Sequence, residues 1–478
     1  MSPHPPQAAD PSRASLEELA RAVLRRAPSR GLAIGWEVEF GEPWRARSEE
    51  ALSAGNVSGG LFDAFLWRLT SPPSEDLVGQ LREVLDGTAR GVVAVPTVPT
   101  EEGGHLPGGG QEDLREAVRT LSEHRFAIQR EQQVEVSAGD DAGRWTFLVT
   151  GVDDYSIRSY REGDEQAILD LFPKCFFVER SREHWNWKYL ENPWGRQTLS
   201  VALAPTSGDL AAHYAGYPMP LWLGEGGRGR RFLALQMGDT MTHPDHRHVG
   251  RGPGSLLART VRHFFALQRG ERFGFFYGFN TGPIQRFCNW FIGGSRVEPV
   301  AFWVREGNSV DSVAGYRVQR EQTVDGSFDR LFRRAAPKYG FLVARDAKYV
   351  DWRYLQCPDD GMVLFTARRW GRLVGWSVFQ RRGERLLWGD AFFDRRHGGA
   401  ARAILSKALS WPAHSGVERV EAWFSERPPW WHEIVTGLGF ERQPHPDGLS
   451  MMALPDTENT AVDRLQDLYY TLGDGDLF

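Results

Sequence analysis

Short apolar runs and longer amphipathic runs alternate along this chain. Apolar runs of about four to eight residues are typical of buried strands, and apolar positions about three or four residues apart are typical of helices. In residues 16–152 the two patterns alternate and end in two successive strands, which predicts an α/β domain. The predicted strands there are 31–35, 62–67, 91–95, 127–136 and 144–149, the predicted helices are 16–24, 75–85 and 112–124, and 43–60 is a predicted loop.

A second α/β unit is predicted over residues 153–306. Asp164 is placed to cap its first helix. The apolar run 232–237 and the helical spacing of the apolar residues in 256–265 are the clearest signals in it. The other predicted strands are 155–158, 199–204, 210–217, 273–279 and 300–304, and the other predicted helices are 165–172 and 280–291.

Residues 307–455 repeat this order more weakly. Trp352-Arg353-Tyr354-Leu355, followed by Pro358, matches Trp187-Lys188-Tyr189-Leu190, followed by Pro193, at the same internal spacing. An internal duplication is the simplest explanation and predicts two related modules in tandem. Residues 1–15 are expected to be a disordered lead, and residues 456–478 a C-terminal tail.

The most informative stretch joins the predicted strand 232–237 to the helix 256–265. It contains His243-Pro244-Asp245-His246 and then Arg247-His248-Val249-Gly250-Arg251-Gly252. Glycines let the backbone approach a ligand closely, and the first turn of a helix offers unpaired N–H groups at the positive end of its dipole. The loop is therefore predicted to bind a pyrophosphate.

Length and composition indicate a globular protein of about three domains. The 478 residues are 41% hydrophobic, and the net charge of −5 gives no overall basic field for DNA. The three cysteines form no Cys-x-x-Cys pair, which argues against a disulfide framework. No apolar run approaches the roughly 18 residues of a membrane span, and the polar N-terminus lacks the apolar core of a signal peptide. We expect a cytoplasmic protein that binds neither membranes nor DNA.

Residues 155–305 resemble a GCN5-related N-acetyltransferase (GNAT) domain, and residues 320–455 resemble a second, more divergent one. The resemblance rests on Arg247-x-x-Gly250-x-Gly252 between a buried strand and an amphipathic helix. It implies that an acyl-CoA, such as acetyl-CoA, pairs its pantetheine arm with the strand edge at Met241 and Thr242. The second copy has Arg395-x-x-Gly398-x-Ala400 and is expected to complete the substrate cleft. The backbone amides implied to hold the pyrophosphate are those of Arg247, His248, Val249, Gly250, Arg251 and Gly252.

Acyl transfer to an amine needs a group that takes the ammonium proton, and a second group can protonate the leaving thiolate. By resemblance, Asp239 is the candidate base, although an Asp that caps the strand end is an equal alternative. The family's usual acid is a Tyr on the helix opened by Asn280, at the position that Phe287 occupies here. Tyr277 or a water could replace that acid, or the thiolate could leave unassisted.

Three histidines, His243, His246 and His248, share the same loop. A zinc site usually has three or more convergent protein ligands, and no further ligand is near them in the sequence. A capping or phosphate-facing role is therefore expected, and no metal site is predicted.

Residues 16–152 resemble the latter part of a class I methyltransferase, which has a Rossmann-like fold. The resemblance lies in the segments FDAFLW, SEDLVGQLREVL and GVVAVP and in the closing strand pair. That family binds S-adenosylmethionine on a Gly-x-Gly-x-Gly loop after its first strand, whereas this chain has Gly35-Trp36-Glu37-Val38. A degenerate domain with a structural or docking role is expected, without S-adenosylmethionine.

The predicted function is transfer of an acetyl or other acyl group from coenzyme A to a small-molecule amine or a similar nucleophile. Two alternatives stay open. Tandem GNAT-like domains also resemble transferases that use aminoacyl-tRNA, and a methyltransferase-like part beside a GNAT domain resembles loading modules that use the phosphopantetheine thioester of a carrier protein in the biosynthesis of specialised metabolites. Phe287 in place of the usual acid would also fit a non-catalytic accessory protein.

Overall fold

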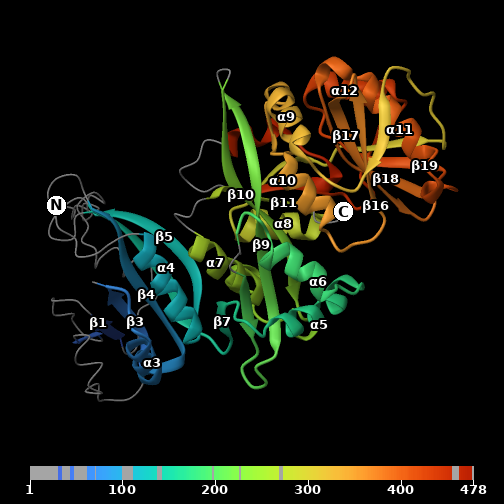
Figure 1. The fold of residues 1–478 in the computed structure, drawn as a ribbon. Coiled ribbons are helices and arrows are strands. Elements are labelled where there is room, and N and C mark those ends of the chain that lie inside the picture. The colour runs from blue at the N-terminus through green and yellow to red at the C-terminus, as the bar shows by residue number, and fades with distance from the viewer. Residues whose placement is uncertain are drawn as a thin grey trace, which may run out of the picture. The chain divides into compact units, whose positions relative to one another are not determined.

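The computed structural model describes residues 31–34, 44–47, 62–69, 71–99, 111–136, 143–195, 199–225, 228–268, 273–454, 462–475 and 478 (Figure 1). The chain divides into two compact units, which are described separately. The first comprises residues up to 178, 198–215 and 239–271, and the second comprises 179–197, 216–238 and 272–478. The predicted lead 1–15 and the predicted helix 16–24 lie outside the described residues.

Six strands of the first unit form a mixed sheet in the order β2-β1-β3-β4-β6-β5. The strands are β1 (Gly31–Ile34), β2 (Trp44–Arg47), β3 (Phe62–Arg68), β4 (Leu85–Pro99), β5 (Phe126–Val136) and β6 (Gly143–Val152). β1 to β4 pair in parallel, and β6 lies antiparallel between β4 and β5. The predicted loop 43–60 is wrong at β2. That strand is short and contains two arginines, so its pairing with β1 orders it without an apolar signal.

Two amphipathic helices, α3 (Glu75–Val84) and α4 (Gln111–Glu123), pack in one core with this sheet. α3 begins after Ser74 because the Ser74 side chain accepts the N–H of Leu77 and satisfies one of the unpaired donors of the first turn. Burial of a large apolar side chain contributes about 1.5–3 kcal/mol. The core includes Phe65, Trp67, Leu77, Val78, Leu81, Leu114, Val118 and Leu121.

A strand and helix series of the predicted order follows. It comprises β7 (Ser156–Ser159), α5 (Glu165–Phe176), β8 (Ser200–Leu203), β9 (Leu210–Glu225), β10 (Arg228–Thr242), α7 (Leu256–Gln268), β11 (Phe273–Asn280) and α8 (Gly282–Phe291). β9 and β10 are longer than predicted, and each contributes residues to both units. Asp164 stands before α5 but does not cap it. Its carboxylate instead accepts both Nη groups of Arg158 at 2.7 and 2.8 Å, because a bidentate charged pair is a stronger interaction.

Two strands pair with strands from the other half of the predicted tandem repeat, 153–306 or 307–455. β21 (Ser450–Leu454) pairs with β11 on one side and with β12 (Ser295–Pro299) on the other. β13 (Phe302–Glu306) was predicted as the last strand of the first module, but it pairs with β19 (Arg419–Trp423) and β20 (Glu441–Gln443). The hydrophobic pattern could not show this exchange, because an apolar run does not specify its partner strand.

The second sheet of this unit has the order β14-β16-β17-β18-β19-β13-β20. Its further strands are β14 (Arg317–Glu321), β16 (Met362–Arg369), β17 (Arg372–Arg382) and β18 (Arg385–Phe393), and its helices include α9 (Gly326–Ala335), α11 (Gly399–Leu409) and α12 (Pro429–Gly437). In the other sheet, the short strands β15 (Phe341–Val343) and β22 (Leu468–Tyr469) extend the edge at β9. Among the described helices, none combines the length and the apolar character that crossing a bilayer requires.

The repeated tryptophan motif has the same conformation in both copies. Trp187 lies in the π-helical turn Asn186–Leu190, and Trp352 lies in the π-helical turn Asp351–Leu355. The two rings stack with centroids 4.9 Å apart and planes 20° apart. Each indole Nε1 donates to the backbone carbonyl of the other tryptophan, at 2.8 and 3.3 Å. Reciprocal contacts of this kind define a local twofold relation and agree with an internal duplication.

Candidate active site

The candidate base lies near the C-terminal end of β10. Asp239 has a φ of 50°, a left-handed conformation that among non-glycine residues is found mainly at Asn and Asp. Nδ1 of the buried His213 donates to the carbonyl oxygen of Asp239 at 2.8 Å and holds this backbone in place. The Asp239 side chain is buried. A left-handed residue inside a strand interrupts the alternation of side chains and so changes where the carboxylate points.

Two glycines determine the conformation of the loop that follows β10. Gly250 and Gly252 have φ values of 69° and 54°, which residues with a Cβ rarely adopt. A Cβ on Gly250 would lie 2.1 Å from the carbonyl oxygen of Gly254. Glycine at position 250 is therefore a conformational requirement of this loop.

The backbone N–H groups of four residues in this loop donate no hydrogen bond within the described part of the chain. They belong to His248, Gly250, Arg251 and Gly252. All four residues are exposed or half-buried, so a ligand could reach them. The other two predicted donors have acceptors within the chain: the N–H of Arg247 donates to the carbonyl of Pro244 at 3.4 Å, and that of Val249 donates to the carbonyl of His246 at 3.1 Å. Free N–H groups clustered in a left-handed turn form an anion-binding arrangement.

The N-terminus of α7 offers fewer free N–H groups to a ligand than predicted. A 3₁₀ turn over Gly252–Gly254 separates the loop from the helix, which begins at Leu256. The N–H of Leu256 donates to the carbonyl of Val249 at 3.0 Å, and the N–H of Ala258 donates to Ser255 Oγ at 3.3 Å. In this first turn only the N–H of Leu257 has no acceptor among the described residues, so most of the free donors lie in the loop.

Side chains from earlier elements support the loop. The Tyr155 hydroxyl hydrogen-bonds Nδ1 of His246 at 2.9 Å. Arg247 Nε and Cys175 Sγ both donate to the carbonyl oxygen of Thr242, at 3.2 and 3.4 Å. Sequence reasoning missed Tyr155 and Cys175, and no local signal could have found Tyr155, which lies 91 positions before its partner.

The residues considered for the acid role lie in β11 and α8 of the second unit. Tyr277 is buried, and its hydroxyl donates to Gln236 Oε1 at 3.1 Å. Burial raises the pKa of this phenol well above its usual value of 10. Asn280 donates through Nδ2 to Cys288 Sγ at 3.7 Å, and Phe287 on α8 is half-buried. Tyr277 therefore holds a proton, but its raised pKa and its bond to Gln236 oppose release of that proton.

The loop 395–400 of the second module has the pattern Arg-x-x-Gly-x-Ala, but its glycine does not have the left-handed backbone of Gly250. Gly398 has a helical φ of −54°. A Cβ on Gly398 would lie 3.0 Å from Ile434 Cδ1, and a Cβ on Gly399 would lie 3.3 Å from the Tyr316 ring. The two glycines therefore allow close packing against neighbouring side chains and do not form an open turn.

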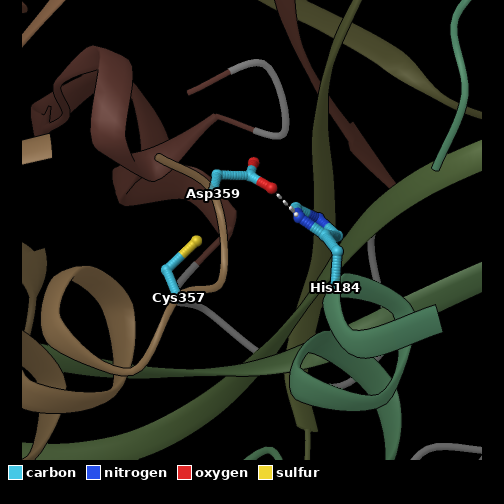
Figure 2. Close-up of side chains that lie close together, drawn as sticks. All are labelled: His184, Cys357 and Asp359. Atoms are coloured by element: carbon cyan, nitrogen blue, oxygen red, sulfur yellow. Dashed lines mark hydrogen bonds and ion pairs between the residues drawn. The ribbon is translucent and has the colours of Figure 1, made fainter. Parts of the chain in front are cut away.

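One group of three potential metal ligands converges among the described residues: His184, Cys357 and Asp359 (Figure 2). His184 Nδ1 lies 2.8 Å from an Asp359 oxygen, and Arg180 Nη1 lies 2.8 Å from His184 Nε2. Both ring nitrogens thus have partners, and burial lowers the pKa of His184. The positive charge of Arg180 would also repel a cation at short range. The arrangement is that of a hydrogen-bonded cluster.

Two of the three loop histidines, His243 and His246, also have protein partners. His243 Nδ1 accepts the N–H of Asp245 at 3.3 Å, and its Nε2 lies 3.2 Å from Lys174 Nζ. His246 hydrogen-bonds Tyr155 as described. His243 therefore acts as the cap of the 3₁₀ turn Pro244–His246, as the loop position suggested.

Comparison with known proteins finds several solved structures that this chain resembles distantly. Solved structures of similar fold include a protein from Enterococcus faecalis described as a probable N-acyltransferase, with 13% identity and a TM-score of 0.46 over 63% of this chain and 72% of that one. A GCN5-related N-acetyltransferase from Anabaena variabilis has 14% identity and a TM-score of 0.47 over the same shares. A tandem GNAT protein from the clavulanic acid biosynthesis pathway has 15% identity and a TM-score of 0.43 over 63% of this chain and 98% of that one.

These structural similarities are distant, and no curated protein sequence matches the chain. The sequence model of the acetyltransferase (GNAT) domain matches residues 156–290. That range contains β10, the loop 247–252, α7 and most of α8. The range that matches the acetyltransferase (GNAT) domain model therefore spans the loop with free N–H groups.

Proposed function

We propose that this protein is an acyltransferase that moves an acetyl or other acyl group from coenzyme A to an amine. The observation that carries the proposal is the set of free N–H groups at His248, Gly250, Arg251 and Gly252. Several donors in one left-handed turn suit the oxygens of a pyrophosphate. Arg251 is exposed and adds a positive charge beside them. Coenzyme A bound there would supply an activated acyl thioester.

The protein would then contribute mainly binding and orientation, with one proton acceptor. Positioning alone can supply a large part of the rate enhancement of a bimolecular transfer. We assign proton acceptance to Asp239, whose left-handed backbone redirects its carboxylate. Tyr277 stays protonated, and a dedicated acid is not required, because a thiol with a pKa of about 8.5 is a tolerable leaving group. Asn280 would help to hold the start of α8 through Cys288.

A small-molecule amine is the proposed acceptor. Transfer from aminoacyl-tRNA or from the phosphopantetheine of a carrier protein would be a variant of the same chemistry. For residues 16–152 we propose a structural or docking role. The antiparallel pair β5–β6 that closes the sheet there is consistent with a methyltransferase-like remnant.

Calorimetric titration of the full chain with acetyl-CoA tests the cofactor assignment. Gly250→Ala should weaken binding at least tenfold, because its Cβ would collide with the Gly254 carbonyl. Gly254→Ala is the matched control in the same loop, since a Cβ there meets nothing within 4 Å. Equal affinity of wild type and Gly250→Ala, or no binding by the wild type, would overturn the proposal. Binding without turnover of any amine would favour the accessory role.

A further inference from the structure

A second candidate binding site lies in the second unit. It is a cavity of about 770 Å³ lined by α9 and by the hairpin that joins β16 to β17. Arg333 and Arg334 lie three and four positions after Arg330 on α9, so both are on the same side of the helix as Arg330. The complete lining is Ser327, Arg330, Arg333, Arg334, Arg368, Gly371, Arg372 and Leu373.

Two of the five arginines that line the cavity lie near carboxylates of the fold. Arg334 Nε binds Asp394 at 2.6 Å, and Arg368 lies 3.8 Å from Glu321. The other three arginines, at positions 330, 333 and 372, are exposed, and none has a carboxylate within ion-pair distance in the described part of the chain. Like charges one turn apart on a helix cost about 0.2–0.5 kcal/mol per pair. The helix dipole favours Arg333 and Arg334, which lie in the last turn of α9. It does not account for Arg372 on the hairpin.

The hairpin tip beside the cavity has two further features that oppose stability. Arg369 and Arg372 stand directly opposite each other across the β16–β17 ladder, and like charges in that position are destabilising. Between them, Trp370 is 89% exposed and has a φ of 50°, which is unusual for a bulky residue. Two-residue turns with positive φ at both positions normally use Asn, Asp or Gly. The guanidinium of Arg369 lies 4.5 Å from the centre of the Trp370 ring.

We infer that this cavity binds a phosphorylated nucleotide, with its phosphates on Arg330, Arg333 and Arg372 and its base against Trp370. Guanidinium groups match phosphate oxygens in bidentate geometry, and an exposed aromatic ring beside cationic groups stacks a base of any sequence. A simple carboxylate or sulfate ligand would leave the exposed tryptophan without a role. A free nucleotide and the end of a single-stranded RNA carry the same chemistry, and both are tested below. The inference does not depend on acyl-CoA binding at Gly250.

Equilibrium binding to the full chain tests the inference with three probes: ADP, a single-stranded oligoribonucleotide and inorganic pyrophosphate. Because ADP and pyrophosphate also suit the loop 247–252, every protein in this test carries Gly250→Ala, and the chain with that substitution alone serves as its wild type. The double variant Arg333→Ala/Arg372→Ala should weaken all three at least tenfold. Trp370→Ala should weaken ADP and RNA at least fivefold and leave pyrophosphate within twofold, because pyrophosphate has no base to stack. Arg381→Ala is the matched control, since Arg381 is an exposed arginine at the other end of β17. RNA binding tighter than ADP would identify a strand end, and equal or weaker binding a free nucleotide.

The variants separate a binding defect from a folding defect. Arg333 and Arg372 are exposed and have no ion-pair partner in the described residues, so their removal should leave the melting temperature unchanged or raise it. The inference fails if none of the three probes binds saturably to the wild type. It also fails if the double variant, still folded, binds ADP and RNA as tightly as the wild type does.

Discussion

Arg345 is the fully buried centre of an ion cluster that holds the C-terminal segment of the second unit. Its Nε donates to Asp390 Oδ1 at 2.9 Å, and its Nη2 binds both the Asp474 carboxylate and the Thr471 hydroxyl. Asp390 and Asp474 are buried as well. Two carboxylates therefore share one guanidinium, and burial raises the pKa of Asp474 to about 6.

Removal of the guanidinium should lower the free energy of unfolding much more than removal of one carboxylate. Arg345→Met leaves two buried carboxylates without a cation, and loss of one partner from a buried ion pair costs about 3–5 kcal/mol. Asp474→Asn keeps the shape of the side chain and leaves one carboxylate for one guanidinium, so we expect a change within about 1 kcal/mol. Arg381→Met, at an exposed arginine, should change stability by no more than about 0.5 kcal/mol.

Urea unfolding of the full chain, followed by tryptophan fluorescence, measures these differences. The pH dependence adds a second test. Because the folded pKa of Asp474 is raised, its contribution to stability is complete below the unfolded pKa near 4 and is lost as the pH rises through 6. The stability of Asp474→Asn relative to the wild type should therefore increase between pH 5 and pH 7. A loss below about 1 kcal/mol in Arg345→Met, or equal losses in both variants, would refute the reasoning.

Three further predictions concern the other parts of the chain. Burial lowers the pKa of His263 to about 3, so its stabilising contribution is complete above pH 6.5 and is lost as the pH falls. Between pH 7 and pH 5 the free energy of unfolding should therefore fall by about 2 kcal/mol less in His263→Gln than in the wild type, as measured by urea unfolding at both pH values. A fragment of residues 153–306 lacks β21 and should be aggregated or unfolded in size-exclusion chromatography and circular dichroism, whereas 153–478 should fold. Asp239→Asn should lower kcat at least about a hundredfold while the Kd for acetyl-CoA stays within twofold, and unchanged turnover would exclude Asp239 as the base.

Local elements were predictable where the hydrophobic pattern was strong. β3, α3, α4, β7 and β11 follow the predicted ranges within two residues. β2 was missed because a short edge strand with two arginines depends on its neighbour and not on its own apolar residues. The partners of β13 and β21 could not be predicted either. Strand pairing depends on the relative energies of alternative tertiary arrangements, and a short stretch of sequence carries no information about those energies.

The sequence motif located the candidate site, but it did not show which backbone N–H groups are free to bind a ligand. The positions of Gly250 and Gly252 follow from the motif, and their positive φ values explain why glycine is needed there. The N–H groups of Arg247 and Val249 already donate to the carbonyls of Pro244 and His246, a detail of the backbone that the motif does not show. The support from Tyr155 and Cys175 comes from segments distant in sequence, so it required the tertiary structure.

The two copies of the motif show why a pattern of residues does not by itself specify a site. Gly250 needs a left-handed backbone, and that conformation leaves neighbouring N–H groups without acceptors. Gly398 at the matching position is helical, and the space around it is filled by Ile434. A duplicated loop that no longer needs to hold an anion is free to pack closely, since packing improves stability. In the second module the unpaired positive charge lies instead on α9 and the β16–β17 hairpin, which is the arrangement expected if the two copies have come to bind different ligands.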